Sequence, residues 1–188
     1  MFYKNYLVHN DLLWERYRKG QIKQEELRVK RMRLALLDFK IADEALSQKM
    51  NILFLDLLPT RTILFPHTKE ILQWLVDKNY ELHLITNGFE KIQHSKLKYS
   101  GLDIFFKEVI TSEGSNSLKP NKEIFEYAFQ KTNANPARSI MIGDTIEVDI
   151  QGAINAGIDQ VFVNYAGVVT DIKPTYTVTS LKELEEIF

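Results

Sequence analysis

The sequence predicts an α/β fold, in which a mostly parallel β-sheet carries helices on both faces and is preceded by a small all-helical segment. Two observations support this prediction. Before about residue 65 the apolar residues recur at helical spacing, whereas from residue 65 onward short apolar runs alternate with amphipathic stretches. This alternation is typical of parallel strands joined by helices. We therefore expect two parts, residues 1–64 and 65–188.

The expected elements can be given in chain order. The first part contains three helices, over residues 3–18, about 23–37 and about 43–57, with Gly20 ending the first. The second part reads as helix 68–78, strand 81–86, helix 90–99 closed by Gly101, strand 108–110, helix 121–131, strand 139–142, helix 148–155 followed by Gly157, and strand 160–163. Ser180 and Glu183 form a capping-box pattern, which predicts a last helix.

Composition excludes several classes of protein. A net charge of -1 and a pI near 6.4 give neither a global basic field for nucleic acid nor the acidic excess of a disordered chain. The chain has no cysteine, which excludes disulfides, thiolate metal sites and cysteine nucleophiles and suits a reducing compartment. Charged and polar residues interrupt the first 17 positions, so they predict neither a signal peptide nor a membrane span. We expect a cytoplasmic protein.

One local stretch departs from this charge balance. Residues 14–33 contain eight Lys or Arg residues and three Glu residues, a pattern that can bind nucleic acid. The acids alternate with the bases along amphipathic helices, however, and a solvated helix face or a surface that attracts anionic substrates accounts for the same charge. We therefore expect no nucleic-acid partner, and a steep salt dependence of DNA or RNA binding would revive the idea.

Three turns follow expected strands, where the ligands of parallel sheets bind. Thr86, Asn87 and Gly88 offer a hydroxyl and approachable backbone N–H groups, which suit a phosphate. Lys119 precedes Pro120, a favoured first helical residue, so we expect its ammonium at a helix amino terminus. In the third turn the carboxylates of Asp144 and Asp149 suit Mg²⁺, which binds one or two carboxylates together with phosphate and water.

Each turn also has an ordinary structural interpretation. Thr-Asn-Gly is common in plain turns, Lys-Pro often begins a solvated helix, and Asp144 can act as a helix cap. Glu147 is read as a first-turn charge that favours the helix dipole. What favours a site is the order: a hydroxyl, a lysine and an acidic pair lie at the carboxyl ends of successive strands.

These motifs resemble those of the haloacid dehalogenase-like phosphohydrolase superfamily. Its second motif is matched by Thr86 in ITNG, its third by Lys119 in LKP, and its fourth by Asp144 and Asp149 in GDTIEVD. The resemblance covers nearly the whole chain: residues from about 65 are similar to the Rossmann-like core and residues 1–64 to the inserted helical cap. TNGF is most similar to the nucleotidase-type subgroup.

The resemblance implies a Mg²⁺-dependent phosphomonoester hydrolase acting on a small phosphorylated substrate. By position, Thr86 would bind the transferring phosphoryl group, with Asn87 and Gly88 beside it, and Lys119 would neutralise its charge and hold the nucleophile. Asp144 would coordinate Mg²⁺ with help from Asp149. Phosphoryl transfer depends mostly on such positioning and charge stabilisation. Response-regulator receivers use similar residues, but their acids come first in the chain and here they come last.

The family's first motif, Asp-x-Asp-x-Thr, is missing from the sequence. Its first Asp attacks phosphorus and its second acts as general acid and base. The nearest imitation is ILFLDLLPT, where Asp56 is followed by Thr60 but residue 58 is Leu. Asp56 also follows the cap-like region instead of preceding it, while Asp11 and Asp38 fall in helical stretches. We therefore expect little or no turnover through a phosphoaspartate, and a noncatalytic binding or interaction domain is the alternative function.

Loss of this motif also removes a strand. In the resembled fold the first strand lies at the centre of the sheet, between the strand ending at Thr86 and the one ending at Ile142. Buried unpaired backbone groups there would each cost about 1–3 kcal/mol. Truncation at the amino terminus, rearrangement, or a strand from another chain would explain the gap, and the resemblance favours truncation as the ancestry. We expect either direct pairing of the two orphaned strands or a homo-oligomer that covers them.

Overall fold

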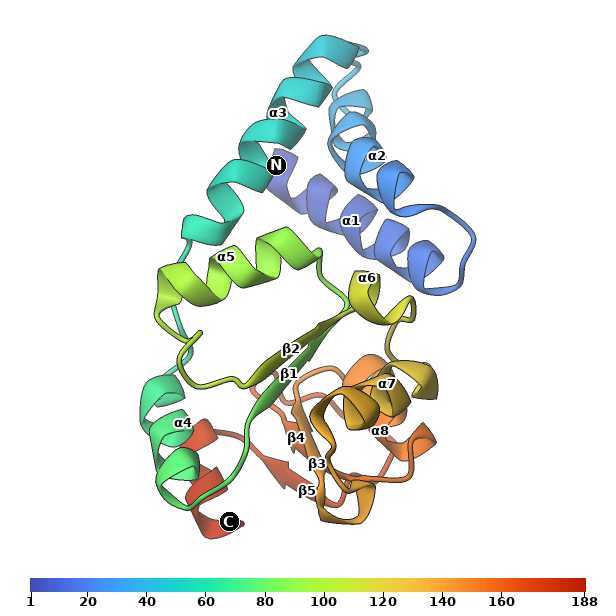
Figure 1. The fold of residues 1–188 in the computed structure, drawn as a ribbon. Coiled ribbons are helices and arrows are strands. Elements are labelled where there is room, and N and C mark those ends of the chain that lie inside the picture. The colour runs from blue at the N-terminus through green and yellow to red at the C-terminus, as the bar shows by residue number, and fades with distance from the viewer. The chain divides into compact units, whose positions relative to one another are not determined.

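The computed structural model describes residues 1–188 and divides them into two compact units. The helical unit spans Met1–Thr60 and the α/β unit spans Arg61–Phe188 (Figure 1). The helical unit ends at residue 60, whereas the hydrophobic pattern predicted a boundary after residue 64. Each unit has its own buried apolar residues, and each is described separately below.

The helical unit contains three helices and a short 3₁₀ turn. They are α1 (Phe2–Arg18), α2 (Gln24–Leu37), α3 (Glu44–Leu57) and η1 (Leu58–Thr60). Gly20 ends α1 as predicted: its φ is +68°, its N–H donates to the Tyr17 carbonyl, and the next N–H, of Gln21, donates to the Arg16 carbonyl. The Asp43 carboxylate begins α3 by accepting a hydrogen bond from the Leu46 N–H at 2.9 Å.

Many charges of the basic stretch are neutralised locally. Lys19 pairs with Glu15, Lys30 pairs with Glu26, and Arg33 pairs with Glu44 of α3. The apolar residues of the same helices turn inward, so Leu27, Met32, Ala35 and Leu36 are buried. These contacts fit the interpretation of residues 14–33 as solvated helix faces.

No helix of the protein is both long enough and apolar enough to cross a membrane.

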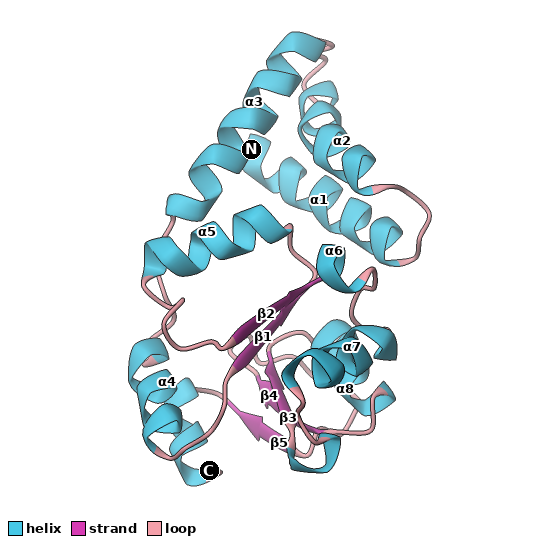
Figure 2. Ribbon diagram, in the orientation of Figure 1, coloured by secondary structure: helices cyan, strands magenta, loops and turns pink.

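The α/β unit alternates helices with short strands (Figure 2). Its elements are α4 (Thr68–Asp77), β1 (His83–Thr86), α5 (Glu90–Ser100), β2 (Glu108–Thr111), α6 (Ser112–Ser115), α7 (Lys122–Thr132), η2 (Pro136–Arg138), β3 (Ile140–Gly143), η3 (Ile146–Ile150), α8 (Gln151–Asn155), β4 (Asp159–Val163), β5 (Tyr176–Val178) and η4 (Leu181–Glu186). All strand pairings are parallel. The predicted α/β class with a mostly parallel arrangement is therefore confirmed.

The strands form two sheets. β1 pairs with β2, from His83 opposite Glu108 to Thr86 opposite Thr111, and the second sheet has the order β3-β4-β5. No backbone pairing joins β1 to β3, so the first of the two expected outcomes, direct pairing of these strands, is wrong; the second, a homo-oligomer that covers them, stays a prediction. Side chains bridge the two sheets instead, as the two apolar clusters of this unit show.

Each apolar cluster takes residues from both sheets. On one side Leu82, just before β1, and Ile142 of β3 pack against a cluster that includes α4 and β4. On the other side Ile85 of β1 and Met141 of β3 pack against the cluster that contains Phe125 of α7 and Ala153 of α8. The two sheets therefore lie in one layer between helices, although their backbones are not joined.

Burial is uneven across this layer. β4 is buried from Gln160 to Val163, whereas every residue of β1 and of β3 is only partly buried. A central pair of strands in a continuous parallel sheet would be covered on both faces and along both edges. Here β1 and β3 each keep one edge without a strand partner.

Several local predictions differ from the structure. β5 and α6 were not expected, and the predicted helix 148–155 is a π-helical turn, η3, followed by α8. α7 begins at Lys122, so Pro120 precedes the helix instead of starting it. The last segment is a 3₁₀ helix in which the Ser180 hydroxyl accepts from the Lys182 N–H and Glu183 accepts from Thr179, a variant of the predicted capping box.

Candidate functional site

Lys119 is the centre at which the predicted turns meet. Its side chain is buried, with 7% of its surface exposed. Its ammonium donates to the carbonyl of Ile85, at the end of β1, at 2.8 Å and to Oδ1 of Asp149 in η3 at 2.6 Å. Lys119 therefore links the carboxyl end of one sheet to the loop that follows β3 in the other. α7 begins at Lys122, three residues after Lys119, so Lys119 does not directly precede the helix as the sequence predicted.

Asp149 anchors both Lys119 and the turn after β3. Its second oxygen, Oδ2, accepts hydrogen bonds from the backbone N–H groups of Asp144 at 3.2 Å and Thr145 at 3.1 Å. The side chain is only 6% exposed. A buried carboxylate with a cationic partner and two amide donors is well satisfied. Both oxygens of Asp149 are therefore engaged within the protein.

Gly143 makes room for this carboxylate. A Cβ at position 143 would lie 2.4 Å from the Asp149 Cβ and 2.7 Å from its Oδ2. Side-chain atoms do not approach one another so closely, and the Asp149 Cβ is fixed to the backbone and cannot turn aside. The glycine that ends β3 is therefore a packing requirement of the site.

Asn87 holds the Lys119 loop from the other side. Its Nδ2 donates to the Lys119 carbonyl at 2.9 Å, and its Oδ1 accepts from the Lys119 N–H at 2.7 Å. The side chain therefore uses both of its polar ends on one backbone residue. Thr86 ends β1, and its hydroxyl oxygen accepts from the Gly88 N–H at 3.0 Å, which closes the turn beside this clamp.

Asp144 differs from Asp149 in its surroundings. Its carboxylate is exposed and makes no hydrogen bond or ion pair within the protein, and Glu147 is exposed as well. Burial raises the pKa of Tyr165, and the negative charge of Asp144 acts in the same direction, which indicates that the two side chains lie near each other. Asp144 is thus the predicted carboxylate that remains available to a ligand.

The acids considered as imitations of a first motif lie elsewhere. Asp56 is exposed in the last turns of α3. Asp11 lies in α1, and Asp38 caps the end of α2, where its carboxylate accepts hydrogen bonds from Asn5 at 2.8 Å and pairs with His9 at 2.9 Å. All belong to the helical unit, and none is among the residues that surround Lys119.

Part of this arrangement was not predicted from the sequence. The order of the turns indicated that Thr86, Lys119 and Asp144 follow the strands, and the structure brings their three loops together around Lys119. It did not indicate the Asn87 clamp or the Gly143 contact, because both depend on side-chain direction. The only sequence signal for Gly143 was a glycine directly after an apolar run.

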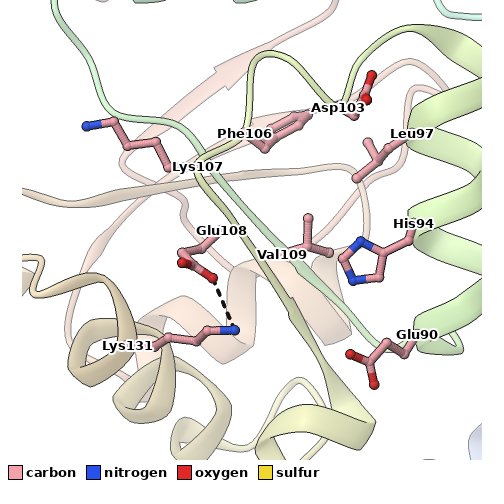
Figure 3. A pocket seen from close by; sticks show the side chains of 9 residues that line it. All are labelled: Glu90, His94, Leu97, Asp103, Phe106, Lys107, Glu108, Val109 and Lys131. Carbon is pink, nitrogen blue, oxygen red and sulfur yellow. Dashed lines mark ion pairs between the residues drawn. The ribbon is translucent and has the colours of Figure 1, made fainter.

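A separate cavity of about 270 Å³ lies beside α5 and β2 (Figure 3). Its lining is mixed in charge, and Glu108 pairs with Lys131 across it at 3.1 Å. The lining residues are Glu90, His94, Leu97, Asp103, Phe106, Lys107, Glu108, Val109 and Lys131. The lining includes neither Lys119 nor its partners Asn87 and Asp149, so this cavity is distinct from the Lys119 site.

The chain was also compared with known proteins. Residues 15–163 match the family model described as haloacid dehalogenase-like hydrolase. The pyrimidine 5'-nucleotidase YjjG of Escherichia coli K12 is 33% identical over 191 residues, which cover 98% of this chain and 81% of that protein. The putative HAD-hydrolase YfnB of Bacillus subtilis 168 is 31% identical over 186 residues, which cover 97% of this chain and 77% of that protein.

A solved structure agrees with these matches. The crystal structure of YfnB bound to magnesium has a TM-score of 0.88 and 28% identity, and the match covers 99% of this chain and 81% of that one. Fold similarity of this extent includes both units. Together with the family match over most of the sequence, it establishes that the chain belongs to the haloacid dehalogenase-like hydrolase family.

Proposed function

We propose that the chain is the phosphate-handling part of a phosphomonoester hydrolase of the nucleotidase type. The observation that carries this proposal is the convergence of three loops, at the ends of β1 and β3 and before α7, on the buried ammonium of Lys119. Support also comes from relatives named as phosphatases or nucleotidases, among them YjjG and the pyrimidine 5'-nucleotidase PynA of Streptococcus pneumoniae R6, which is 36% identical over 118 residues.

In this proposal the residues divide into those that contact the substrate and those that position them. The Thr86 hydroxyl and the N–H groups after it bind the phosphate, and Lys119 supplies the positive charge that stabilises the developing negative charge. Asn87 and Asp149 are positioning residues, because their polar atoms are already bonded to Lys119 and its neighbours. The geometry therefore favours an anchoring role for Asp149 over the metal-ligand role inferred by resemblance.

Mg²⁺ fits this site only if the phosphate of the substrate supplies some of its ligands. The structure contains no group of three or more His, Cys, Asp or Glu residues able to hold a metal ion. Mg²⁺ commonly binds one or two carboxylates and completes its shell with substrate phosphate and water. Asp144 would supply the carboxylate, and the cation would supply charge neutralisation at the phosphate. We therefore expect Mg²⁺ to bind appreciably only with a phosphate ester present.

The 188 residues contain no Asp-x-Asp pair. We propose that this chain by itself has little or no turnover through a phosphoaspartate. The test is to purify the chain, verify its mass, and assay p-nitrophenyl phosphate and a pyrimidine nucleoside monophosphate with Mg²⁺. Turnover that survives Asp56→Asn but disappears with Asp144→Asn would show that this account of the nucleophile is wrong.

Binding can be tested without turnover. A pyrimidine nucleoside monophosphate with Mg²⁺ is titrated into the chain by calorimetry, and we expect binding to be lost in Lys119→Met. The matched control is Lys122→Met, because Lys122 is an exposed lysine three residues away that pairs with Glu126 at 3.0 Å. Equal losses in both variants would contradict the assignment of Lys119 to the site.

A second candidate function is a noncatalytic interaction domain, and the unpaired edges of β1 and β3 favour it. Exposed strand edges present unpaired backbone groups to other chains. In this version a homo-oligomer covers the incomplete layer. Light scattering at two protein concentrations tests it: a mass of one chain, 21.9 kDa, at both concentrations would exclude a stable homo-oligomer.

A further inference from the structure

The helical unit buries three polar side chains that have hydrogen-bonding atoms without partners. We define the Arg31 cluster as Arg31 of α2 with Ser47 and Asn51 of α3. They are 3%, 1% and 8% exposed, respectively. Helical spacing places Arg31 on the same face as Leu27 and Ala35, both completely buried, so a charged residue occupies a position of the apolar face.

Most polar atoms of this cluster have no partner. Nε and Nη2 of Arg31, Oγ of Ser47 and Oδ1 of Asn51 are enclosed and make no hydrogen bond. The remaining contacts of Arg31 are modest: the guanidinium lies 4.8 Å from the centre of the Phe54 ring and interacts with the Tyr6 hydroxyl. Buried polar groups without partners are rare in folded proteins and are costly when they carry charge.

The cluster also lacks a negative charge. Burial lowers the pKa of Arg31, the Tyr6 hydroxyl opposes that effect, and nearby Arg28 adds to it, while no carboxylate acts on the group. A guanidinium does not lose its proton within a protein, so its charge persists. Arg33 provides the contrast, because this arginine of the same helix is exposed and pairs with Glu44 at 3.2 Å.

We propose that the Arg31 cluster is a binding site for one oxyanion group, a phosphate or carboxylate, of a small ligand. The free Nε and Nη2 form one edge of the guanidinium fork, which matches two oxygens of such a group. Ser47 and Asn51 lie on α3, the helix whose Phe54 ring contacts the guanidinium, and each has a buried polar atom without a partner. This site lies in the helical unit and is independent of the proposed role of Lys119.

Because the free atoms are enclosed, an anion can enter only when α2 and α3 separate locally. A bound anion then opposes that opening, so amide hydrogen exchange of these two helices reports occupancy. The full chain is titrated separately with inorganic phosphate and with acetate. At ten times the midpoint concentration of the effective anion, we expect exchange in α2 and α3 to slow about tenfold.

Three variants make the test specific. Arg31→Met should abolish the slowing, whereas Arg31→Lys, which keeps the charge but loses the fork, should move the midpoint to about tenfold higher concentration. Arg33→Met is the matched control and should respond like the natural chain. Lys119→Met should also respond normally, which separates this site from the proposed phosphate site.

Two results would overturn the proposal. One is the absence of a saturable response to either anion in the natural chain, which would mean that water alone satisfies the cluster. The other is the same response in folded Arg31→Met and Arg31→Lys as in the natural chain, with folding verified by circular dichroism. A response to phosphate without one to acetate would support the proposal and assign the site to phosphate groups.

Discussion

Lys119 in the α/β unit and Arg31 in the helical unit are both buried cations, but the protein treats them differently. Lys119 has a carboxylate at 2.6 Å and a backbone carbonyl at 2.8 Å. Arg31 has an aromatic ring and a hydroxyl nearby, two nitrogens without partners and no carboxylate. Both residues are buried, at 7% and 3% exposed, so the difference lies in the counter-charge and not in the depth of burial.

The two residues differ in whether a carboxylate of the protein balances the buried positive charge. The Lys119 charge is balanced by Asp149, and the residues around it hold the ammonium in one place before any ligand arrives. Under the proposed function, a charge held in one place stabilises the negative charge that develops on a phosphate. The Arg31 charge has no carboxylate partner within the protein, and in our proposal an oxyanion of a ligand balances it. The following predictions test the Lys119 half of this contrast, from the largest expected effect to the smallest.

Removal of the counter-charge should have the largest effect. Asp149→Ala leaves the Lys119 ammonium buried without a carboxylate, and we expect the free energy of unfolding to fall by about 3–5 kcal/mol. Urea unfolding followed by circular dichroism measures it. The matched control is Asp144→Ala, because Asp144 is exposed and should change the value by less than about 0.5 kcal/mol. Similar losses in the two variants would abolish the distinction between the two acids.

Crowding of the carboxylate should come next. In Gly143→Ala the new Cβ meets the Asp149 Cβ at 2.4 Å, so the turn or the ion pair has to move. We expect a loss of about 3 kcal/mol, at the upper end of the range for overpacking. Thermal unfolding measures it, with Gly114→Ala as control, because the nearest side-chain atom there is the Thr111 hydroxyl oxygen at 3.3 Å. An unchanged melting temperature for Gly143→Ala would mean that Asp149 is not tightly placed.

Release of the Lys119 loop should have a smaller effect. Asn87→Ala removes the two hydrogen bonds to the Lys119 backbone, and we expect a loss of about 2 kcal/mol. Asn87→Asp keeps the acceptor for the Lys119 N–H but loses the donor to its carbonyl, so its loss should be intermediate. Chemical unfolding of the natural chain and both variants gives the order. If Asn87→Asp were the less stable variant, the clamp would not be the main contribution of this side chain.

The smallest effect should come from His83, a partly buried basic group of β1. Its Nδ1 has no hydrogen-bond partner, and burial lowers the pKa of the imidazole below its ordinary value of 6.5. The unfolded chain then binds more protons than the folded one, so stability should fall as the pH drops through and below about 6.5. Unfolding measured between pH 7.5 and pH 5 tests this before most carboxylates titrate. His83→Phe should reduce the slope, and an unchanged slope would exclude His83 as its cause.

The sequence predicted the parts of the molecule that depend on pattern. The alternation of apolar runs and helices predicted the α/β class, and the turns after the strands predicted that Thr86, Lys119 and Asp144 share one region. Strand β5 was missed because three residues give too little alternation to recognise. The start of α7 was predicted too early, because the prediction assumed that Pro120 begins the helix, whereas Pro120 and Asn121 both precede it.

Arg31 shows a different limit of sequence reasoning. Within residues 14–33 it was counted as one of many solvated charges, since composition does not reveal which face of a helix a residue occupies. Leu27 and Ala35 lie four residues before and after Arg31, and this spacing was the available signal that Arg31 lies on the apolar face. The separation of the strands into two sheets was expected in part, because the missing motif predicted a gap, but the outcome at that gap depended on backbone positions that no local pattern determines.

No backbone hydrogen bonds join β1 to β3, so Lys119 helps to hold the two sheets together. Its ammonium links two half-layers that also meet through apolar side chains. An anion that drew the ammonium away from Asp149 would loosen this link, so occupancy and rigidity of the two half-layers should change together. The Lys119 Nζ atom would therefore both contact the ligand and hold the two half-layers together.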